Sequence, residues 1–254
     1  MSNKLLITGA TGYIASHVLN KLKLQNFDEI ILCDRSFKLD RLQQKYDFKL
    51  KELDLSEYYE IDFSQINTIV HCAYLNDNES ELKFLTQIHK DTFLVFISSA
   101  AVYGEGAGTV VNIDSATRPI NTYGFNKLRL ENFIKAAFKN HAILRVSNPY
   151  GKEFSQKNFF SIAKNKFENN QYLTLNCEHA NEIVRDFIDI DSCSEKIVKV
   201  IENQLQGIFN ISSGKAQSLE EFLSANIENL DKNLIHYATK RANEIQYSVL
   251  EPNI

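Results

Sequence analysis

The sequence lacks several features that would point to particular classes of protein. Its four cysteines form no CxxC pair and its six histidines show no metal-ligand spacing, so neither a disulfide framework nor a metal site is expected. No apolar run reaches the roughly 18 residues of a membrane span, and the first residues do not resemble a signal peptide. Because Cys33 and Cys72 lie in apolar, strand-like runs, we expect buried free thiols in a cytoplasmic protein.

An excess of positive charge is also missing. The net charge is −4 at pH 7, which argues against a nucleic-acid or anionic membrane surface. Hydrophobic residues make up 44% of the chain and charged residues 24%, an ordinary globular balance. No internal repeat or low-complexity linker interrupts the sequence. Its 254 residues therefore suit one large domain, or a domain with a smaller appendage.

Short apolar runs alternate with helical patterns through the first half of the chain. Strands are expected over residues 4–8, 29–33, 48–53, 66–72, 93–98 and 142–146, and helices over 13–24, 79–89 and 123–138. The strands are rich in Ile, Val and Leu on both faces. This pattern predicts a doubly wound α/β fold, with a parallel sheet covered by helices on both sides.

The later part of the chain is less regular. A loop and an amphipathic helix are expected within residues 151–170, a strand within 184–191, a helix over 194–204 and a strand over 207–212. Ser218 precedes Glu221 by three residues at the start of a further helical pattern, and this spacing predicts a capping box.

The segment TGATGYIA, residues 8–15, joins the first expected strand to the first helix. Gly9 permits a tight turn, Gly12 lets the backbone approach a pyrophosphate, and Ala15 keeps helix and sheet close. Asp34 ends the second strand about 20 residues later, where a carboxylate would bond the adenosine ribose. Arg35 could instead meet a 2′-phosphate, so NAD is the predicted cofactor and NADP the alternative.

Nine short motifs, in this order, resemble the extended short-chain dehydrogenases, specifically the NAD-dependent nucleotide-sugar epimerase/dehydratase family. They are TGATGYIA, Asp34, DLS (54–56), HCA (71–73), SSAAVYG (98–104), YGFNK (123–127), LRVSNPYG (144–151), RDFIDID (185–191) and GIFNISSG (207–214). The resemblance implies a Rossmann-type sheet with a small, discontinuous C-terminal substrate-binding part. Residues 1–151, joined again by 185–205, would bind the dinucleotide, and residues 152–184 and 206–254 the substrate.

The resemblance also assigns an active site. Tyr123 is implied as the acid/base, Lys127 as its partner and Ser99 as the residue that bonds the substrate oxygen. A free tyrosine has a pKa of roughly 10, too high for a base near neutrality. A lysine four residues away lies on the same helix face, and both it and an oxidised nicotinamide favour the phenolate. Developing charge on the substrate oxygen would be stabilised by the Ser99 hydroxyl.

Further contacts follow only from the resemblance. Asn148 and Arg185 are matched to residues that bind the diphosphate, Arg241 and Glu244 to a pair that reaches the diphosphate and the nucleoside ribose, and Asp54 to the adenine contact. The full cofactor set is Gly9, Thr11, Gly12, Tyr13, Ile14, Asp34, Arg35, Asp54, Leu55, Ala73, Tyr123 and Lys127. The full substrate set is Ser99, Asn148, Arg185, Arg241 and Glu244.

Some features depart from the family pattern. Ala100 and Ala101 stand where family 4,6-dehydratases carry an acidic pair, so dehydration is not expected. The span from His71 to Ser98 is short for the family, and helices in this region commonly help its members form dimers. A homodimer therefore stays an open alternative. The shortened C-terminal region leaves the completeness of a substrate lid open.

Three functions remain after this comparison. The expected one is reduction of a nucleotide-linked 4-keto-6-deoxy sugar, as in deoxysugar biosynthesis, because RANEIQYS (241–248) resembles the 3,6-dideoxysugar synthases. The alternative is an NAD-retaining C4 epimerase, which would use the same residues. A catalytically silent, dinucleotide-sensing protein on the same fold is the third. Such proteins usually lose Ser99, Tyr123 or Lys127, whereas all three are present here.

Overall fold

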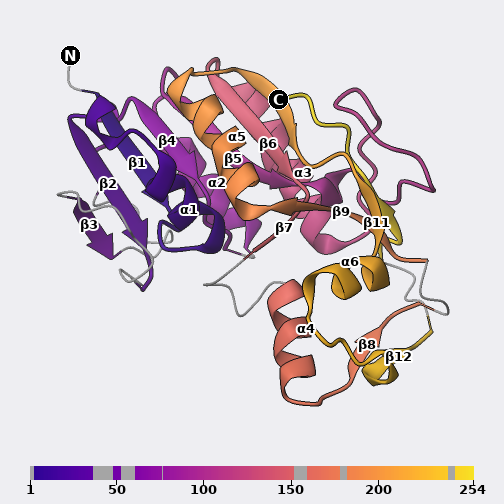
Figure 1. Cartoon of the computed structure of the whole chain (residues 1–254). Coiled ribbons are helices and arrows are strands. Elements are labelled where there is room, and N and C mark those ends of the chain that lie inside the picture. Colours follow the sequence, from indigo (N-terminus) through magenta and orange to yellow (C-terminus); the bar gives the residue numbers. More distant parts are fainter. Residues whose placement is uncertain are drawn as a thin grey trace.

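The computed structural model describes residues 3–36, 48–52, 61–75, 77–151, 159–177, 182–239 and 244–254. These residues form a large part built on one central sheet and a small lobe attached to it (Figure 1). No helix in these ranges is long and apolar enough to span a membrane.

Seven parallel strands make up the central sheet. In chain order they are β1 (Lys4–Thr8), β2 (Glu29–Asp34), β3 (Lys49–Glu52), β4 (Thr68–His71), β5 (Phe93–Ser99), β6 (His141–Val146) and β10 (Gly207–Ile211). Across the sheet the order is β10-β6-β5-β4-β1-β2-β3, with every neighbouring pair parallel. The direction of winding reverses between β1 and β4. In such sheets ligands bind beyond the carboxyl ends of the strands at this reversal.

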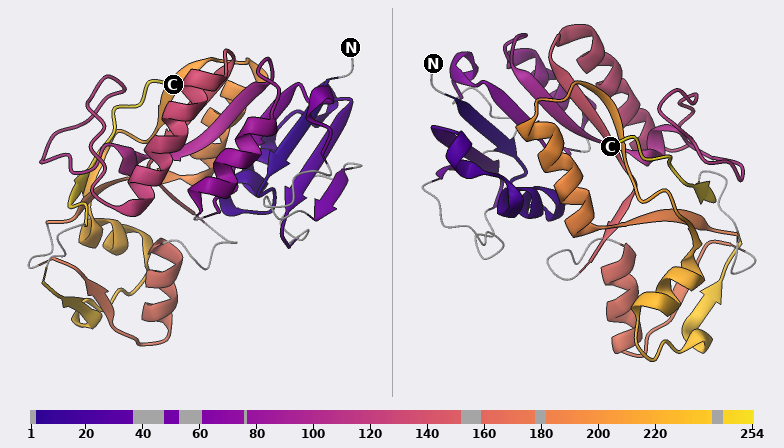
Figure 2. Two further views of the ribbon diagram at one scale, coloured as in Figure 1. Left: turned by 180° about the vertical axis from the view of Figure 1, so that it is seen from behind. Right: turned by 45° about the horizontal axis from the view of Figure 1, so that its top comes forward.

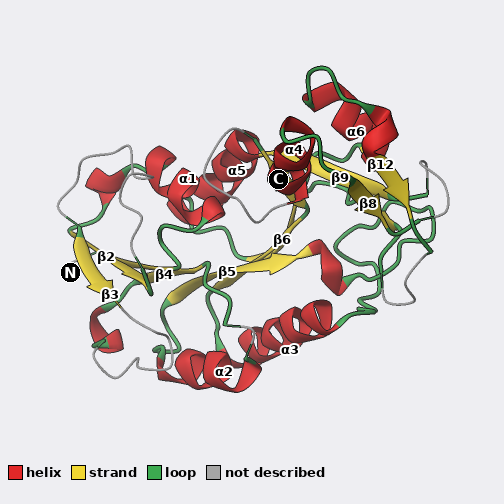
Figure 3. Ribbon diagram, turned by 90° about the horizontal axis from the view of Figure 1, so that it is seen from below, coloured by secondary structure: helices red, strands yellow, loops and turns green. Residues whose placement is uncertain are grey.

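Helices cover both faces of the sheet, as predicted. Helices α1 (Tyr13–Lys21) and α5 (Ile190–Glu202) lie on one face, and α2 (Asn78–Gln87) and α3 (Thr122–Ala137) on the other (Figure 3). Short 3-10 helices follow or precede strands at Leu24–Asn26, Phe63–Gln65, Ala100–Val102 and Lys232–Leu234. The doubly wound parallel arrangement expected from the apolar strands is therefore confirmed.

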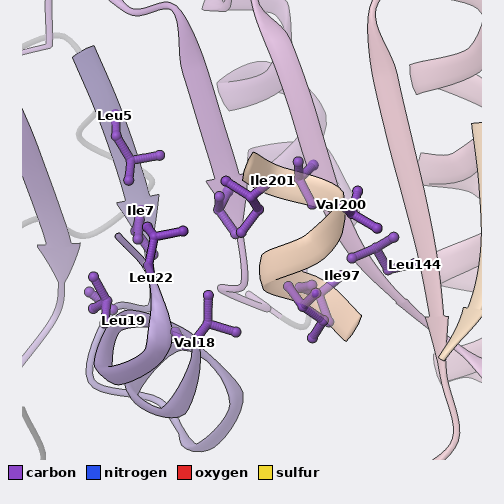
Figure 4. Packing of buried hydrophobic residues seen from close by; sticks show 14 of the residues in the cluster. Leu5, Ile7, Val18, Leu19, Leu22, Ile97, Leu144, Val200 and Ile201 are labelled. Carbon is purple, nitrogen blue, oxygen red and sulfur yellow. The ribbon is translucent and has the colours of Figure 1, made fainter. Parts of the chain in front are cut away.

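The alternation of side chains along β1 supplies both cores. Leu5 and Ile7 pack with Val18 and Leu19 of α1 and Val200 of α5 on one face (Figure 4). Leu6 points to the other face and joins the cluster that includes buried residues of α2 and α3. Successive residues of a strand point to opposite faces, so a strand buried on both sides is apolar throughout.

The small lobe consists of α4 (Phe159–Glu168), β8 (Leu173–Leu175), α6 (Leu219–Asn226) and β12 (Ile235–Tyr237). It has its own core, in which the rings of Phe187 and Phe222 stack with centroids 3.6 Å apart. A four-stranded sheet of β7 (Asn148–Tyr150), β9 (Val184–Asp189), β11 (Ala216–Ser218) and β13 (Tyr247–Ser248) leads to it. The lobe lies on the side where the central strands end (Figures 1 and 2).

Several boundaries differ from those expected. The first helix ends at Lys21, because the backbone at Leu22 is already extended. The helix expected over 194–204 begins earlier, at Ile190, since the Asp189 carboxylate accepts from the N–H groups of Asp191 and Ser192. The capping box between Ser218 and Glu221 is confirmed. Strands β7, β8, β11, β12 and β13 were not predicted.

The predicted boundary of the substrate-binding part does not coincide with the edge of the central sheet. Residues 206–254 were assigned to the substrate-binding part, yet β10 (Gly207–Ile211) pairs with β6 in the central sheet. The end of the C-terminal segment also reaches this sheet. The N–H of Asn210 in β10 donates to Asn253 Oδ1 at 2.7 Å, and Ile254 packs against the core beside α1 and α5.

Candidate active site

The glycine turn lies at the reversal point, between β1 and α1. Gly9 has a φ of +62°, and a Cβ at this position would lie 3.0 Å from the Cα of Ala73. Only glycine tolerates both the left-handed backbone and this approach. The Gly12 N–H closes the turn on Gly9 O at 2.9 Å. Thus the turn brings Ala73, predicted to contact the cofactor, against the glycines.

Helix α1 begins without a side-chain cap. Gly12 is the N-cap residue, and no side chain of the described residues caps the start of the helix. Free amides at a helix start favour an anion such as a pyrophosphate. Tyr13 and Ile14 carry two of these amides. Their side chains turn inward and pack on the core beside α1 and α5. Together with the glycine turn, this arrangement fits a dinucleotide pyrophosphate.

Asp34, at the end of β2, holds the glycine turn in place. Its Oδ2 accepts from the backbone N–H and the hydroxyl of Thr11, both at 2.8 Å. Among the described residues, its Oδ1 receives only a long contact from Ser36 N at 3.5 Å, which leaves acceptor capacity for a ribose hydroxyl. Arg35 is exposed beside it. Asp54 and Leu55, also predicted to contact the cofactor, lie outside the described residues.

A buried polar chain runs from the glycine turn to α2. Thr8 Oγ1 lies 2.7 Å from His71 Nδ1, and His71 Nε2 lies 3.2 Å from Glu81 Oε1. All three side chains are fully buried. Thr8 Oγ1 also accepts from Ala73 N at 3.3 Å. His71 and Glu81 were not predicted as site residues, because only the fold brings the start of α2 beneath the end of β4.

Ser99 and Tyr123 meet at the carboxyl end of β5. Asn121 caps α3 by accepting from Gly124 N at 2.9 Å. A Cβ at Gly124 would lie 2.5 Å from Ala101 O, so this glycine allows α3 to approach the turn after Ser99. The hydroxyl of Tyr123 lies close enough to that of Ser99 to lower the pKa of the phenol. Ser99 Oγ also accepts from Ala101 N at 3.2 Å.

Lys127 lies one helical turn from Tyr123 and is buried, with 3% of its surface exposed. Its ammonium donates to Ile97 O at 3.0 Å and lies 4.7 Å from the centre of the Phe96 ring and 4.9 Å from that of Tyr74. The Tyr74 ring also meets the Tyr123 ring edge to face, with centroids 5.1 Å apart. Tyr74 was not predicted as a site residue.

The two ionisable groups of this pair are shifted in opposite directions. Tyr123 keeps 41% of its surface exposed. The groups around its hydroxyl nevertheless exclude water from it and raise its pKa above the ordinary value, although the Ser99 hydroxyl opposes the change. Burial lowers the pKa of Lys127, and the carboxylate of Glu81 partly offsets it. Both shifts favour the neutral form of the group. A neutral phenol is the proton-donating form of Tyr123.

A second buried network supports the site from below. Ser98 donates to Glu131 Oε1 at 2.6 Å. The Arg145 guanidinium donates to the same carboxylate, from Nη2 to Oε2 at 2.7 Å. Arg145 Nη1 also donates to Tyr103 OH at 2.9 Å, which donates to Asn210 Oδ1 at 2.8 Å. Glu131 follows Lys127 by four residues, so its position on the inner face of α3 could be predicted from spacing. Its pairing with Arg145 could not be predicted in this way.

Two of the predicted substrate residues, Asn148 and Arg185, lie in the four-stranded sheet. Asn148 Nδ2 donates to Asp186 O at 2.9 Å. Arg185 donates through Nη1 to Gln246 O at 2.8 Å and through Nη2 to Ile245 O. Burial lowers its pKa to about 10, while Glu105 and Glu244 oppose the shift. Arg185 therefore clamps the C-terminal segment that carries Glu244. Arg241 lies outside the described residues.

No group of three or more His, Cys, Asp or Glu side chains within the described ranges is arranged to hold a metal ion. The four cysteines form no disulfide, and three of them are buried. Near the carboxyl ends of β1, β4 and β5 lie hydroxyls, the His71 imidazole, a tyrosine, a lysine and the amides at the start of α1. This set suits a dinucleotide and a proton-transfer step.

Solved structures with this fold bind nucleotide sugars. UDP-glucuronic acid 4-epimerase from Bacillus cereus, in complex with UDP-glucuronic acid and NAD, aligns with a TM-score of 0.81 over 98% of this chain and 90% of that chain, at 22% identity. UDP-N-acetylglucosamine 4-epimerase from Methanobrevibacter ruminantium M1, in complex with UDP-N-acetylmuramic acid, gives 0.78 over 100% and 91%, at 19% identity.

A dehydratase is similar to the same degree. The dTDP-glucose 4,6-dehydratase from Bacillus anthracis, in complex with NAD, aligns with a TM-score of 0.80 over 99% of this chain and 88% of that chain, at 18% identity. At these identities the likeness establishes the fold. The sequence itself matches the family model of the NAD dependent epimerase/dehydratase family over residues 5–212. With most of its length matched, the chain belongs to the NAD-dependent epimerase/dehydratase family.

Proposed function

We propose that this protein is an NAD-dependent oxidoreductase that reduces the 4-keto group of a nucleotide-linked sugar. The observation that carries the proposal is the close approach of the Ser99 and Tyr123 hydroxyls beside the glycine turn. The pKa of Tyr123 lies above its ordinary value, so at neutral pH the side chain is a phenol that can give a proton. Reduction needs this proton donor, whereas oxidation of a carbinol first needs the phenolate.

The protein's own groups would act on the substrate oxygen. A bound reduced nicotinamide dinucleotide supplies the hydride to C4 of the sugar. Tyr123 gives its proton to the carbonyl oxygen, and Ser99 donates a hydrogen bond to the same atom. The ammonium of Lys127 stabilises the negative charge left on Tyr123. We assign the ribose contact to Asp34, with NAD as cofactor and NADP as the alternative because Arg35 is adjacent.

The nucleoside diphosphate would lie along the four-stranded sheet. Asn148 and Arg185 are assigned to the diphosphate, and Glu244 with Arg241 to the diphosphate and ribose. Arg185 has donors beyond those that clamp the C-terminal segment, since a guanidinium carries five N–H groups. The absence of an acidic residue at Ala100 and Ala101 supports reduction over dehydration.

The second candidate is C4 epimerisation with a retained cofactor. The two 4-epimerases with this fold support it, and one of them holds NAD. The same Ser99, Tyr123 and Lys127 would serve, with the hydride returned to the other face of the sugar. The two reactions differ in whether the cofactor leaves the protein in each cycle.

The cofactor content tests these proposals. Freshly purified protein is denatured, and any released nicotinamide dinucleotide is identified by mass. Near-stoichiometric NAD would favour epimerisation, whereas an empty protein that binds added NADH or NADPH would favour reduction. If neither dinucleotide binds, the proposed function is wrong.

Tyr123→Phe tests the chemistry directly. Turnover of a nucleotide-linked 4-keto sugar should fall by a factor of about 10² or more, with dinucleotide affinity unchanged. Tyr172→Phe, an exposed tyrosine of the small lobe, is the matched control and should behave as wild type. Wild-type turnover by Tyr123→Phe would exclude Tyr123 as the acid.

A further inference from the structure

Tyr74 lies between the two residues proposed to handle the proton. It belongs to the loop after β4, and its ring contacts side chains from the first two turns of α3. The edge-to-face contact with Tyr123 has an interplanar angle of 85° and a centroid distance of 5.1 Å. The Lys127 ammonium lies 4.9 Å from the centre of the same ring. One side chain therefore touches both members of the pair.

The position of Tyr74 is fixed from the cofactor side of the site. Its neighbour Ala73 donates to Thr8 Oγ1 at 3.3 Å, and Gly9 leaves room for the Ala73 backbone. At its far end, the Tyr74 hydroxyl accepts a long hydrogen bond from Asn126 Nδ2 at 3.5 Å. The residue thus links the glycine turn to α3.

The contacts of the Tyr74 ring stabilise the Lys127 charge and orient the Tyr123 ring. A buried ammonium is costly unless its charge is compensated, and Lys127 has a single carbonyl partner, Ile97 O, among the described residues. Aromatic faces attract such a cation, and Lys127 lies near two of them, Tyr74 and Phe96. Edge-to-face packing likewise fixes the plane of the Tyr123 ring.

We propose that Tyr74 is a positioning residue of this site, which holds the Tyr123 ring and the Lys127 ammonium in a fixed relation through its aromatic ring rather than its hydroxyl. The catalytic consequence rests on the proposed function, but the positioning does not. Without the ring, water would enter beside Tyr123, and both side chains would gain rotational freedom.

Besides burial, three groups shift the pKa of Tyr123. Ser99 on β5 lowers it, and the charges of Tyr74 in the loop after β4 and of Glu81 on α2 raise it. Burial is the largest cause of its raised pKa. Removal of the Tyr74 ring therefore lets the pKa of Tyr123 fall toward the ordinary tyrosine value. Glu81 and Ser99 stay in place in such a variant.

The test is a titration of Tyr123 in the full-length protein. Tyrosine labelled with ¹³C at Cζ is followed by NMR, and the Tyr123 signal is assigned with Tyr123→Phe. Tyr74→Phe removes only the charge of the Tyr74 phenolate, whereas Tyr74→Ala removes the ring as well. We therefore expect Tyr123 to titrate in Tyr74→Ala at a pH lower by about half a unit or more than in Tyr74→Phe. Tyr74→Leu serves if the alanine variant fails to fold, and Tyr172→Ala is the control. An unchanged titration in Tyr74→Ala or Tyr74→Leu would overturn the proposal.

Activity gives the second readout. With a nucleotide-linked 4-keto sugar, kcat/KM should fall about tenfold or more in Tyr74→Ala and less than about threefold in Tyr74→Phe. The alkaline limb of the pH profile should move further to lower pH in the alanine variant than in the phenylalanine variant. If wild type turns over no such sugar while the titration shifts as expected, the proposed function fails and the positioning role stands.

Discussion

Glu131 and Arg145 form a two-pronged ion pair beneath the edge that carries Ser99. Arg145 Nη2 lies 2.7 Å from Glu131 Oε2, and Nε lies 3.1 Å from Oε1. Both side chains are buried, and the carboxylate also accepts from Ser98. The pair joins α3 to β6 and, through Tyr103 and Asn210, to β10.

Breaking this pair should be strongly destabilising. Glu131→Gln leaves the Arg145 charge buried without a counter-charge, and we expect a loss of about 3–5 kcal/mol in the free energy of unfolding. Urea denaturation measures it. Glu168→Gln breaks the exposed pair with Lys164 on α4 and should cost less than about 1 kcal/mol. Equal losses in the two variants would contradict the prediction.

Gly9→Ala should damage the glycine turn in two ways. The φ of +62° strains any other residue, and the new Cβ would press on the Ala73 backbone at 3.0 Å. We expect the free energy of unfolding to fall by about 1–3 kcal/mol. Dinucleotide affinity should fall by about tenfold or more.

Gly108→Ala separates these two effects. Gly108 has a φ of +81°, but nothing lies within 4 Å of a Cβ there. This control should show the backbone strain alone, with dinucleotide affinity unchanged in equilibrium titrations. If Gly9→Ala binds the dinucleotide as well as Gly108→Ala does, the close approach to Ala73 is unimportant for binding.

The Glu81–His71 pair should make stability depend on acid pH. Burial raises the pKa of Glu81, but the hydrogen bond and charge of His71, with Lys127 nearby, outweigh it and leave the pKa below its ordinary value. A carboxylate with a lowered folded-state pKa contributes stability above about pH 4.5, the unfolded value. That contribution is lost as the pH falls through the folded-state pKa.

Glu81→Gln removes this contribution. Urea unfolding at a series of pH values should show wild type losing stability more steeply than Glu81→Gln below about pH 4.5. Glu79→Gln, an exposed position on the same helix, should follow wild type. Parallel curves for wild type and Glu81→Gln would mean that Glu81 does not titrate differently on folding.

Ser218→Ala should weaken the start of α6. The Ser218 hydroxyl accepts from Glu221 N at 3.2 Å, and the Glu221 carboxylate accepts from Ser218 N at 2.9 Å. Loss of the cap should cost about 1 kcal/mol in thermal or urea unfolding. Ser224→Ala, on the exposed side of the same helix, should be neutral or slightly stabilising, because alanine favours a helix. A smaller loss in Ser218→Ala than in Ser224→Ala would contradict the capping role.

The central sheet was largely predictable from sequence, because its inner strands, β1, β4, β5 and β6, are buried on both faces and are therefore mostly apolar runs. Strands of two or three residues, such as β11 and β13, show no periodicity and depend on pairing with β9. The glycine turn and the Tyr123–Lys127 spacing are local signals and were also predictable.

Contacts between segments far apart in the sequence could not be predicted. Asp34 was predicted to face a ribose, and the structure adds its bonds to Thr11, which no local pattern encodes. Arg185 was predicted to bind a diphosphate, and the structure shows it on carbonyls some 60 residues further along the chain. Tyr74 lies in a loop without periodicity, and its role depends on how closely α3 approaches the end of β5.

The parallel sheet has a consequence for synthesis on the ribosome. Strand β10 is the outer partner of β6, yet about 60 residues, including part of the small lobe, separate the two along the chain. At typical translation rates of about 5–20 residues per second, the apolar edge of β6 waits roughly 3–12 s for its partner to be made. During that interval the nascent chain presents an unpaired strand edge, so co-translational chaperones have a defined segment, His141–Val146, to protect.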